Sequence, residues 1–185
     1  MTTQTQVESV IGAIFSPDRK EVLLVERDDL PVWVLPGGGV EASESLENAI
    51  IREILEETGF TVKIERLVGL YLPANSLTKT THLYECIILE GEAKPSEETK
   101  QVRFFPRTQL PYFLPPPFKE WIEDAFIIQP TLCKTMHDVN YKNLFFYFTK
   151  HPVLVFRFVL GLLQKYVLAA RIPKVFMRDE RHRNN

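Results

Sequence analysis

The chain has 185 residues, of which 45% are hydrophobic and 25% are charged, which is typical of a globular domain with room for an appended segment. Its two cysteines, Cys86 and Cys133, lie far apart and without metal-ligand spacing, which argues against a disulfide framework and favours a reduced compartment. The first residues are polar and lack the apolar run of a secretory signal, so we expect a cytoplasmic protein.

Charge is distributed unevenly along the chain, although the net charge is only −2. Residues 1–132 hold 12 Lys and Arg against 21 Asp and Glu, a net charge of −9. Residues 133–185 hold 10 against 3, a net charge of +7. We therefore expect two parts with different roles: a folded domain over residues 1–132 and a basic, apolar helical extension over residues 133–185.

The N-terminal part begins with two segments rich in Val, Ile and Leu, residues 7–15 and 21–26. A turn at Ser16-Pro17-Asp18 separates them, and the pattern predicts two strands of one sheet. The short apolar segment 33–35 then runs into Pro36 and three glycines. We expect residues 36–39 to form a tight loop, because glycine allows backbone conformations that other residues avoid.

A helix is predicted over residues 45–58. Its apolar side chains recur every four residues on one side: Leu46, Ile50 and Ile54. Ser43 or Ser45 can cap its start, and Gly59 suits its end.

Further strands are expected at residues 61–71, 81–89 and 102–105, and a last helix at residues 117–128. Strands and helices are mixed in this order, so the pattern favours a layered α/β or α+β domain that ends near Leu132.

Three carboxylates stand close together on the predicted helix: Glu53, Glu56 and Glu57 are spaced i, i+3 and i+4. Like charges at that spacing repel one another unless a cation neutralises them. Carboxylate oxygens are hard ligands that suit Mg²⁺ or Mn²⁺. Arg52, four residues before Glu56, can hold that carboxylate in one orientation through a paired hydrogen bond.

The glycine run lies just before this helix, and it places exposed backbone groups beside the predicted metal. Backbone amides next to a cation form a typical phosphate site. Gly37, Gly38 and Gly39 are therefore candidates for contact with a phosphorylated substrate.

The spacing of these residues resembles the Nudix box at every defined position. Gly38 is followed after five residues by Glu44, and after seven more by the run Arg52-Glu53-Ile54-Leu55-Glu56-Glu57-Thr58-Gly59-Phe60. Segments 33–38 and 96–105 also look like parts of that family, so the resemblance covers roughly residues 7–128.

This resemblance implies a Nudix-type α/β/α sandwich with a mixed β-sheet, and hydrolysis of a nucleoside diphosphate linked to another group. It carries over the following roles: metal ligation by Glu53, Glu56, Glu57 and the carbonyl of Gly37 or Gly38, orientation by Arg52, and support of the loop–helix junction by Glu44. The general base is expected to be Glu53 or Glu98.

Other interpretations of the same residues remain open. The carboxylates could form a solvated helix face, or the fold could serve as a nucleotide-sensing or interaction module without catalysis. Glu97 could replace Glu98 in its role. The first substrate class we expect is ADP-ribose or a nucleotide sugar, with a nucleoside triphosphate or a dinucleoside polyphosphate as the alternative.

The C-terminal part contains a mostly apolar stretch at residues 153–170, which Arg157, Gln164 and Lys165 interrupt. Central basic residues make it a poor membrane-spanning helix. It could cover the folded domain, form a homodimer interface, or lie on the inner face of a membrane with the help of its basic residues. The stretch is too apolar for a phosphate-tracking arm, which argues against a nucleic-acid partner.

Overall fold

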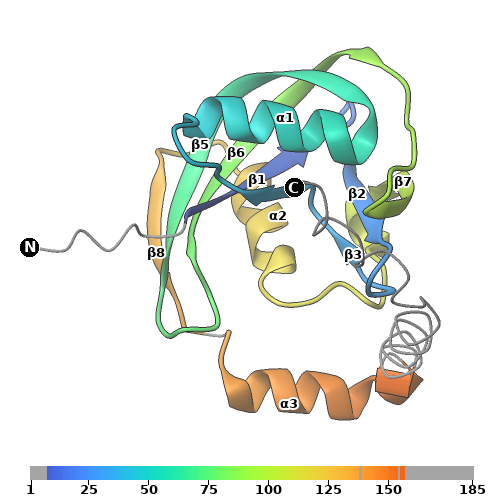
Figure 1. Cartoon of the computed structure of the whole chain (residues 1–185), viewed down its shortest axis with the longest axis vertical. Helices are drawn as coiled ribbons and strands as arrows, with labels where there is room; N and C mark the ends of the chain where they lie inside the picture. Colours follow the sequence, from blue (N-terminus) through green and yellow to red (C-terminus); the bar gives the residue numbers. More distant parts are fainter. Residues whose placement is uncertain (1–7, 138, 154, 157–185) are drawn as a thin grey trace, which may run out of the picture.

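The structure, a computed structural model, describes residues 8–137, 139–153 and 155–156 (Figure 1). In chain order its elements are β1 (Glu8–Ile14), β2 (Glu21–Arg27), β3 (Trp33–Val34), β4 (Gly37–Gly39), α1 (Leu46–Thr58), β5 (Phe60–Pro73), β6 (Thr80–Gly91), β7 (Thr99–Pro106), the 3₁₀ turn η1 (Arg107–Gln109), α2 (Phe118–Phe126), β8 (Leu132–Met136) and α3 (Tyr141–Lys150).

The strands form two sheets. The larger has the order β4-β1-β6-β5-β8, with β1–β6 and β5–β8 parallel and the other pairs antiparallel. The smaller sheet has the order β3-β2-β7 and is antiparallel. The predicted α/β class with a mixed sheet is therefore confirmed.

Helices α1 and α2 cover opposite faces of the larger sheet (Figure 1). Side chains alternate between the faces of a strand, so Val10 of β1 packs with Ile50 of α1 while Ile11 packs with the cluster that contains Trp121 of α2. This arrangement is the predicted three-layer α/β/α sandwich, and it places the core on both sides of one sheet.

The prediction that residues 7–15 and 21–26 are strands of one sheet is wrong, because β1 lies in the larger sheet and β2 in the smaller one. Both edges of β1 are occupied, by β4 on one side and β6 on the other, so β2 has no free edge to join. A single bridge between Phe15 and Val22 connects the strands at the turn, and β2 then pairs with β3 and β7.

The glycine run was expected to be a loop, but Gly37–Gly39 forms strand β4, paired antiparallel with β1. Gly37 has φ +144°, a value that side chains disfavour, and a Cβ atom there would overlap the carbonyl oxygen of Val10. Glycine thus lets this short strand lie directly against β1, and the strand carries the chain to the start of α1.

Helix α1 matches its prediction closely. The hydroxyl of Ser45, and not of Ser43, accepts a 3.2 Å hydrogen bond from the N–H of Asn48 and caps the helix. Gly59 ends it in the left-handed conformation, with φ +78°, and donates to the carbonyl of Leu55. Both ends of the helix that carries the acidic motif are therefore fixed by local chemistry.

The sheet continues past the domain boundary expected at Leu132. Strand β8 pairs in parallel with β5 from Gly69↔Leu132 to Pro73↔Met136. Helix α3 follows, whereas most of the apolar stretch predicted at residues 153–170 lies outside the described residues. Within the described part of the chain, no helix has the length and hydropathy needed to span a membrane.

Candidate active site

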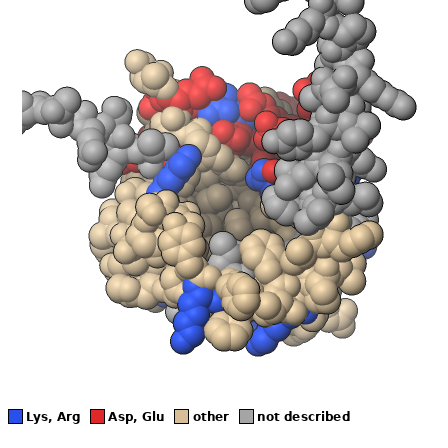
Figure 2. Space-filling view, turned by 60° about the horizontal axis from the view of Figure 1, so that its bottom comes forward, with Lys and Arg blue, Asp and Glu red and all other residues tan. Residues whose placement is uncertain are grey.

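A cleft of about 560 Å³ lies where β2, β4, α1 and the segment before β7 meet. Its walls contain six carboxylates but only two arginines, and the lining residues are Arg27, Gly37, Gly38, Glu41, Arg52, Glu53, Glu56, Glu57, Ser96, Glu97 and Glu98. Figure 2 shows acidic side chains gathered along one edge of the face it displays. The cleft is therefore strongly negative, and it brings together two parts of the sequence that lie more than 35 residues apart.

Glu57 is the most buried carboxylate of the cleft, with 6% of its surface exposed. The backbone N–H of Gly37 donates a 2.9 Å hydrogen bond to Glu57 Oε2. Burial raises the pKa of Glu57 to about 7, because loss of water outweighs the stabilising hydrogen bond from Gly37 and the charge of Arg27. An ionised Glu57 at neutral pH consequently favours a nearby positive charge.

Glu53 lies one turn earlier on α1 and directly beside Gly38 of β4. A Cβ atom at Gly38 would lie 2.5 Å from Glu53 Oε1, so only glycine leaves room for this carboxylate. Burial also raises the pKa of Glu53, an effect that the hydrogen bond and charge of Arg52 oppose. The glycine strand and the helix thus enclose two carboxylates with little access to water.

Arg52 binds three carboxylates, but its paired hydrogen bond does not go to Glu56 as predicted. Its paired hydrogen bond goes to Glu44, with Nε–Oε1 2.9 Å and Nη2–Oε2 3.0 Å, while Glu56 receives a single bond of 3.2 Å. Glu53 accepts a further bond of 3.1 Å. The guanidinium of Arg52 forms its paired bond with Glu44 because that carboxylate, half-buried at the start of α1, faces both Nε and Nη2.

Glu44 and Gly39 lie outside the cleft and act through Arg52. Glu44 accepts a hydrogen bond from the N–H of Glu41, and the guanidinium of Arg52 holds the pKa of Glu44 below its ordinary value. The carbonyl of Gly39 accepts a 3.3 Å bond from Arg52 Nη2. Both residues therefore connect the β4–α1 junction to the arginine.

The carboxylates of the cleft are the groups that could hold a divalent cation. Among the described residues, no three His, Cys, Asp or Glu side chains are close enough to share one ion, because Glu53 and Glu56 turn to Arg52 while Glu57 binds the Gly37 amide. The donor set nevertheless fits: hard carboxylate oxygens, two of them desolvated with raised pKa values, line one cleft. Small rotations of Glu53 and Glu56 away from Arg52 are required to gather them.

Glu98 and Glu97 both reach the cleft from the segment before β7, but they differ in how they are held. The backbone carbonyl of Glu98 accepts a 2.8 Å hydrogen bond from the N–H of Asp28, and its own N–H donates to the hydroxyl of Ser96. The charge of Glu98 acts on Glu53 and Glu57, raising the pKa of each. The charge of Glu97 is not among the main effects on either group, so Glu98 acts on the buried carboxylates more strongly.

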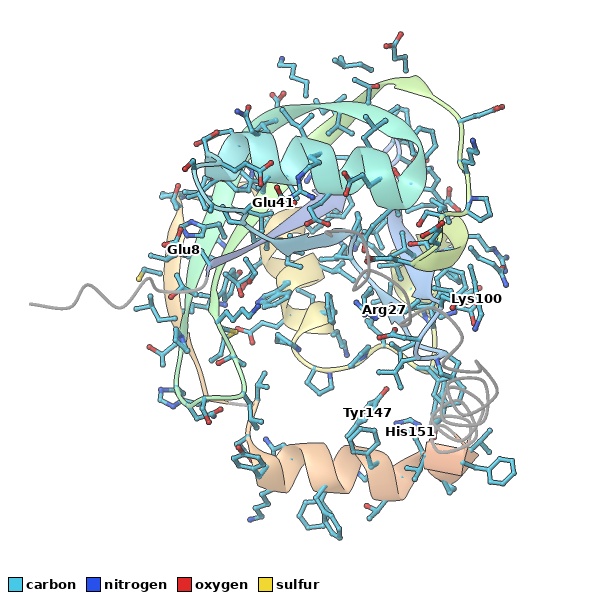
Figure 3. All side chains as sticks on the ribbon, in the orientation of Figure 1. Glu8, Arg27, Glu41, Lys100, Tyr147 and His151 are labelled. Atoms are coloured by element: carbon cyan, nitrogen blue, oxygen red, sulfur yellow. The ribbon has the colours of Figure 1, made fainter. Side chains whose placement is uncertain are left out.

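Arg27 is the second arginine of the cleft and was not predicted from the sequence (Figure 3). It lies at the end of β2, and its guanidinium forms a paired interaction with Asp29 through bonds of 2.7 and 2.8 Å. The sequence signal was available: a charged residue ends an apolar strand and is followed two residues later by a carboxylate. Glu41 was also missed, because nothing in its loop pattern distinguishes it from a solvated residue.

The sequence of this chain is similar to those of known proteins. A family model described as the NUDIX domain matches residues 6–126. The chain is 37% identical over 108 residues to a putative 8-oxo-dGTP diphosphatase of Bacillus subtilis, covering 58% of this chain and 72% of that protein. It is 35% identical over 107 residues to an ADP-ribose pyrophosphatase of Methanocaldococcus jannaschii, covering 55% of this chain and 63% of that protein.

Solved structures share the fold. An ADP-ribose pyrophosphatase of Streptococcus suis superposes with a TM-score of 0.61 at 27% identity, over 71% of this chain and all of that one. A UDP-X diphosphatase superposes with a TM-score of 0.63 at 29% identity, over 71% and 69% of the two chains. Because the family model spans more than half of the chain and carries the acidic cleft with it, this protein belongs to the Nudix hydrolase family.

Proposed function

We propose that this Nudix hydrolase cleaves the phosphoanhydride bond of a nucleoside diphosphate linked to another group, with ADP-ribose or a nucleotide sugar as the preferred substrate class. The observation that carries this proposal is the pairing of desolvated carboxylates on α1 with the glycine strand β4 in one cleft. Relatives named ADP-ribose pyrophosphatase and UDP-X diphosphatase favour that substrate class. The relative named 8-oxo-dGTP diphosphatase keeps nucleoside triphosphates as the alternative.

Nudix hydrolases generally work with a divalent metal ion, and we propose Mg²⁺ or Mn²⁺ here. Glu53, Glu56, Glu57 and the carbonyl of Gly38 would hold it. When bound, such an ion supplies positive charge that neutralises phosphate oxygens and makes water a better nucleophile. Glu57 is the ligand with the greatest need of that charge, because it is the most buried of the three.

Two arginines have separate roles in this proposal. Arg52 holds the carboxylates of Glu53 and Glu56 beside each other in the absence of metal, and its paired bond to Glu44 keeps it in place when they turn to the ion. Arg27 is the cation of the cleft that does not bind a box carboxylate. Asp29 holds its Nε and Nη2 atoms, and Nη1 would bind a phosphate oxygen. Arg27 thus contributes substrate binding, whereas Arg52 positions ligands.

Glu98 is the proton acceptor that we favour over Glu53 and Glu97. Among the described residues its carboxylate has no hydrogen-bond or ion-pair partner, and its backbone is anchored on both sides. Glu53 is already engaged by Arg52 and adjacent to Gly38, so it is better placed as a ligand. A carboxylate free to accept a proton from water is what general base catalysis requires.

The test is product analysis of the purified chain with ADP-ribose, a UDP-sugar, a deoxynucleoside triphosphate and a dinucleoside polyphosphate, each with Mg²⁺, Mn²⁺ or EDTA. We expect metal-dependent release of a nucleoside monophosphate from the first two substrates, and none with EDTA. Preferential hydrolysis of the triphosphate would replace the substrate class. Nucleotide binding without turnover of any substrate would favour a sensing module on the Nudix fold.

A further inference from the structure

Among the described residues, helix α3 (Tyr141–Lys150) packs on the folded domain through one side. Tyr147 and Phe148 pack against the small buried cluster of Val25, Val32 and Val34. Just after the helix, His151 is 8% exposed, and its ring centroid lies 4.4 Å from that of Tyr147. Figure 3 shows Tyr147 pointing from the helix toward the domain, with His151 beside it. These contacts fix which side of α3 faces outward.

The opposite side of α3 carries large aromatic side chains in contact with solvent. Tyr141 is 67% exposed, Phe145 66% and Phe146 51%, and beyond the helix Phe156 is exposed as well. Tyr141 and Phe145 are four residues apart and share one row of the helix. Isolated exposed apolar residues are ordinary, but a contiguous row of aromatic ones marks an interaction surface.

Basic residues accompany these aromatic groups. Lys142 and Lys150 are exposed and lie in the same helical row as Phe146, at i, i+4 and i+8. Over residues 139–178 the sequence holds seven Lys and Arg and no Asp or Glu. In Figure 2, basic and uncharged side chains occupy the lower part of the displayed face, whereas the acidic ones gather at its upper edge.

We propose that the outward face of α3, formed by Tyr141, Lys142, Phe145, Phe146 and Lys150, docks on the surface of an anionic lipid bilayer. Aromatic rings enter the boundary between headgroups and acyl chains, and lysines bind lipid phosphates from the same face. Residues 1–132 have a net charge of −9 and residues 133–185 a net charge of +7. An anionic membrane attracts the positive part and repels the negative one, so α3 approaches the membrane first.

The charge pattern selects a lipid surface over a second copy of the chain. An isologous dimer through this face would bring its lysines together, with no carboxylate in residues 139–156 to neutralise them. The length of the helix also fits surface docking, since ten residues span about 15 Å, half of the ~30 Å hydrocarbon core. Such a helix lies in the plane of the interface.

The test is flotation of the full chain with phosphatidylcholine vesicles that contain either no anionic lipid or about 30% phosphatidylglycerol. Wild-type protein is expected to float with the anionic vesicles only, and less so as NaCl is raised, because salt screens the lysines. Phe145→Ser/Phe146→Ser and Lys142→Glu/Lys150→Glu should each reduce the bound fraction at least about tenfold.

Matched controls replace equally exposed residues elsewhere: Leu89→Ser/Ile128→Ser for the aromatic pair and Lys63→Glu/Lys94→Glu for the lysines. These should bind like wild type. Circular dichroism and thermal melting establish that each variant is folded.

Absence of wild-type binding to anionic vesicles would overturn the proposal, as would equal losses in the control variants. A wild-type dimer that Phe145→Ser/Phe146→Ser dissociates, without vesicle binding, would assign the face to a second copy. Hydrolysis in free solution is measured separately on the same preparations, so failure of membrane docking and failure of the proposed enzymatic function are distinguished.

Discussion

The backbone N–H of Gly37 donates a 2.9 Å hydrogen bond to Oε2 of Glu57, twenty residues further along the chain. This bond joins strand β4 to the buried end of α1 and sets the distance between the glycine strand and the acidic helix. It stabilises an ionised carboxylate, yet burial has the larger effect and raises the pKa of Glu57 to about 7. Above pH 7 the fold without metal therefore holds a destabilising charge in the cleft.

The first prediction concerns the stability of chelated protein. A carboxylate whose folded pKa is raised from 4.5 to about 7 favours the folded state below pH 4.5, and that stability is lost as pH rises toward 7. From pH 4.5 to pH 8, the loss for Glu57 approaches ~3 kcal/mol. Glu57→Gln removes this charge and keeps an oxygen for the Gly37 amide, so with EDTA at pH 8 it should melt at a higher temperature than wild type.

The same comparison at pH 4.5, where Glu57 is already neutral, should show little difference between the two proteins. Adding Mg²⁺ at pH 8 should raise the melting temperature of wild type more than that of the variant, since binding to the folded state stabilises it. Equal pH dependence of wild type and Glu57→Gln would mean that this carboxylate is not the source of the effect.

The second prediction is that Glu57→Gln loses turnover by about 100-fold or more while its fold is kept. Loss of a residue that only hydrogen-bonds to a metal ligand lowers metal affinity or activity about 10- to 100-fold. A direct ligand should be worth at least as much. The measurement is kcat with saturating Mg²⁺, and near-normal activity would show that the metal lies elsewhere. Glu47→Gln, an exposed carboxylate in the first turn of the same helix, is the matched control and should retain activity.

The third prediction separates the three glycines of β4. Gly38→Ala places a methyl group 2.5 Å from Glu53 Oε1, so the flexible glutamate must turn away: the fold should survive and activity should fall. Gly37→Ala meets the backbone of Val10 at φ +144° and should lower the free energy of unfolding by about 2 kcal/mol or more. At Gly39 an added Cβ meets no atom within 4 Å, so Gly39→Ala should keep both stability and activity.

The surroundings of these glycines show which parts of the site could be predicted from the sequence. The acidic triad, the arginine and the capped helix could be predicted, because a helix fixes the relation of residues three and four apart. Strand β4 could not, since its pairing depends on the distant edge of β1 and glycine has no strand preference of its own. The pairing of Arg52 with Glu44 was missed for a similar reason: eight residues and a helix start separate them.

The arrangement of the strands in the two sheets could not be predicted from the sequence either. Residues 7–15 and 21–26 are typical strands, but local pattern cannot tell which partner takes each edge, and here the parallel pairing of β1 with β6 bridges about 70 residues. Arg27 and Glu98 meet in the cleft because β2 pairs with β7, which is again a long-range event. The box itself was visible in sequence, whereas the residues around it required the tertiary structure.

A fourth prediction follows from the position of Arg27. Replacement by Ala should raise KM for the nucleotide substrate about tenfold or more, the loss typical of a charged hydrogen-bonding partner, and change kcat less. Arg27→Lys should recover only part of the affinity, because an ammonium group lacks the planar fork that Asp29 and a phosphate can bind. Lys100→Ala, which removes a nearby cation outside the cleft lining, should keep KM close to the wild-type value.

The last prediction uses two adjacent glutamates to identify the proton acceptor. Glu98 has an anchored backbone and is among the main charges that act on Glu53 and Glu57, whereas Glu97 lines the same cleft and is not among them. Glu98→Gln should lower kcat by about 100-fold or more, the usual contribution of a general base. Glu97→Gln should keep kcat near the wild-type value, and KM should change little in either variant.

The metal affinity of Glu98→Gln shows whether a lower kcat comes from the loss of a proton acceptor or from the loss of a metal ligand. Titration of each variant with Mn²⁺, followed by the enhancement of water proton relaxation, should give similar affinities for wild type, Glu97→Gln and Glu98→Gln if Glu98 accepts a proton and ligates no metal. Weaker Mn²⁺ binding in Glu98→Gln would make it a ligand, and the base would then be sought at Glu53. A large loss in Glu97→Gln instead would exchange the roles of the two neighbours, because the segment before β7 presents both side chains to the same cleft.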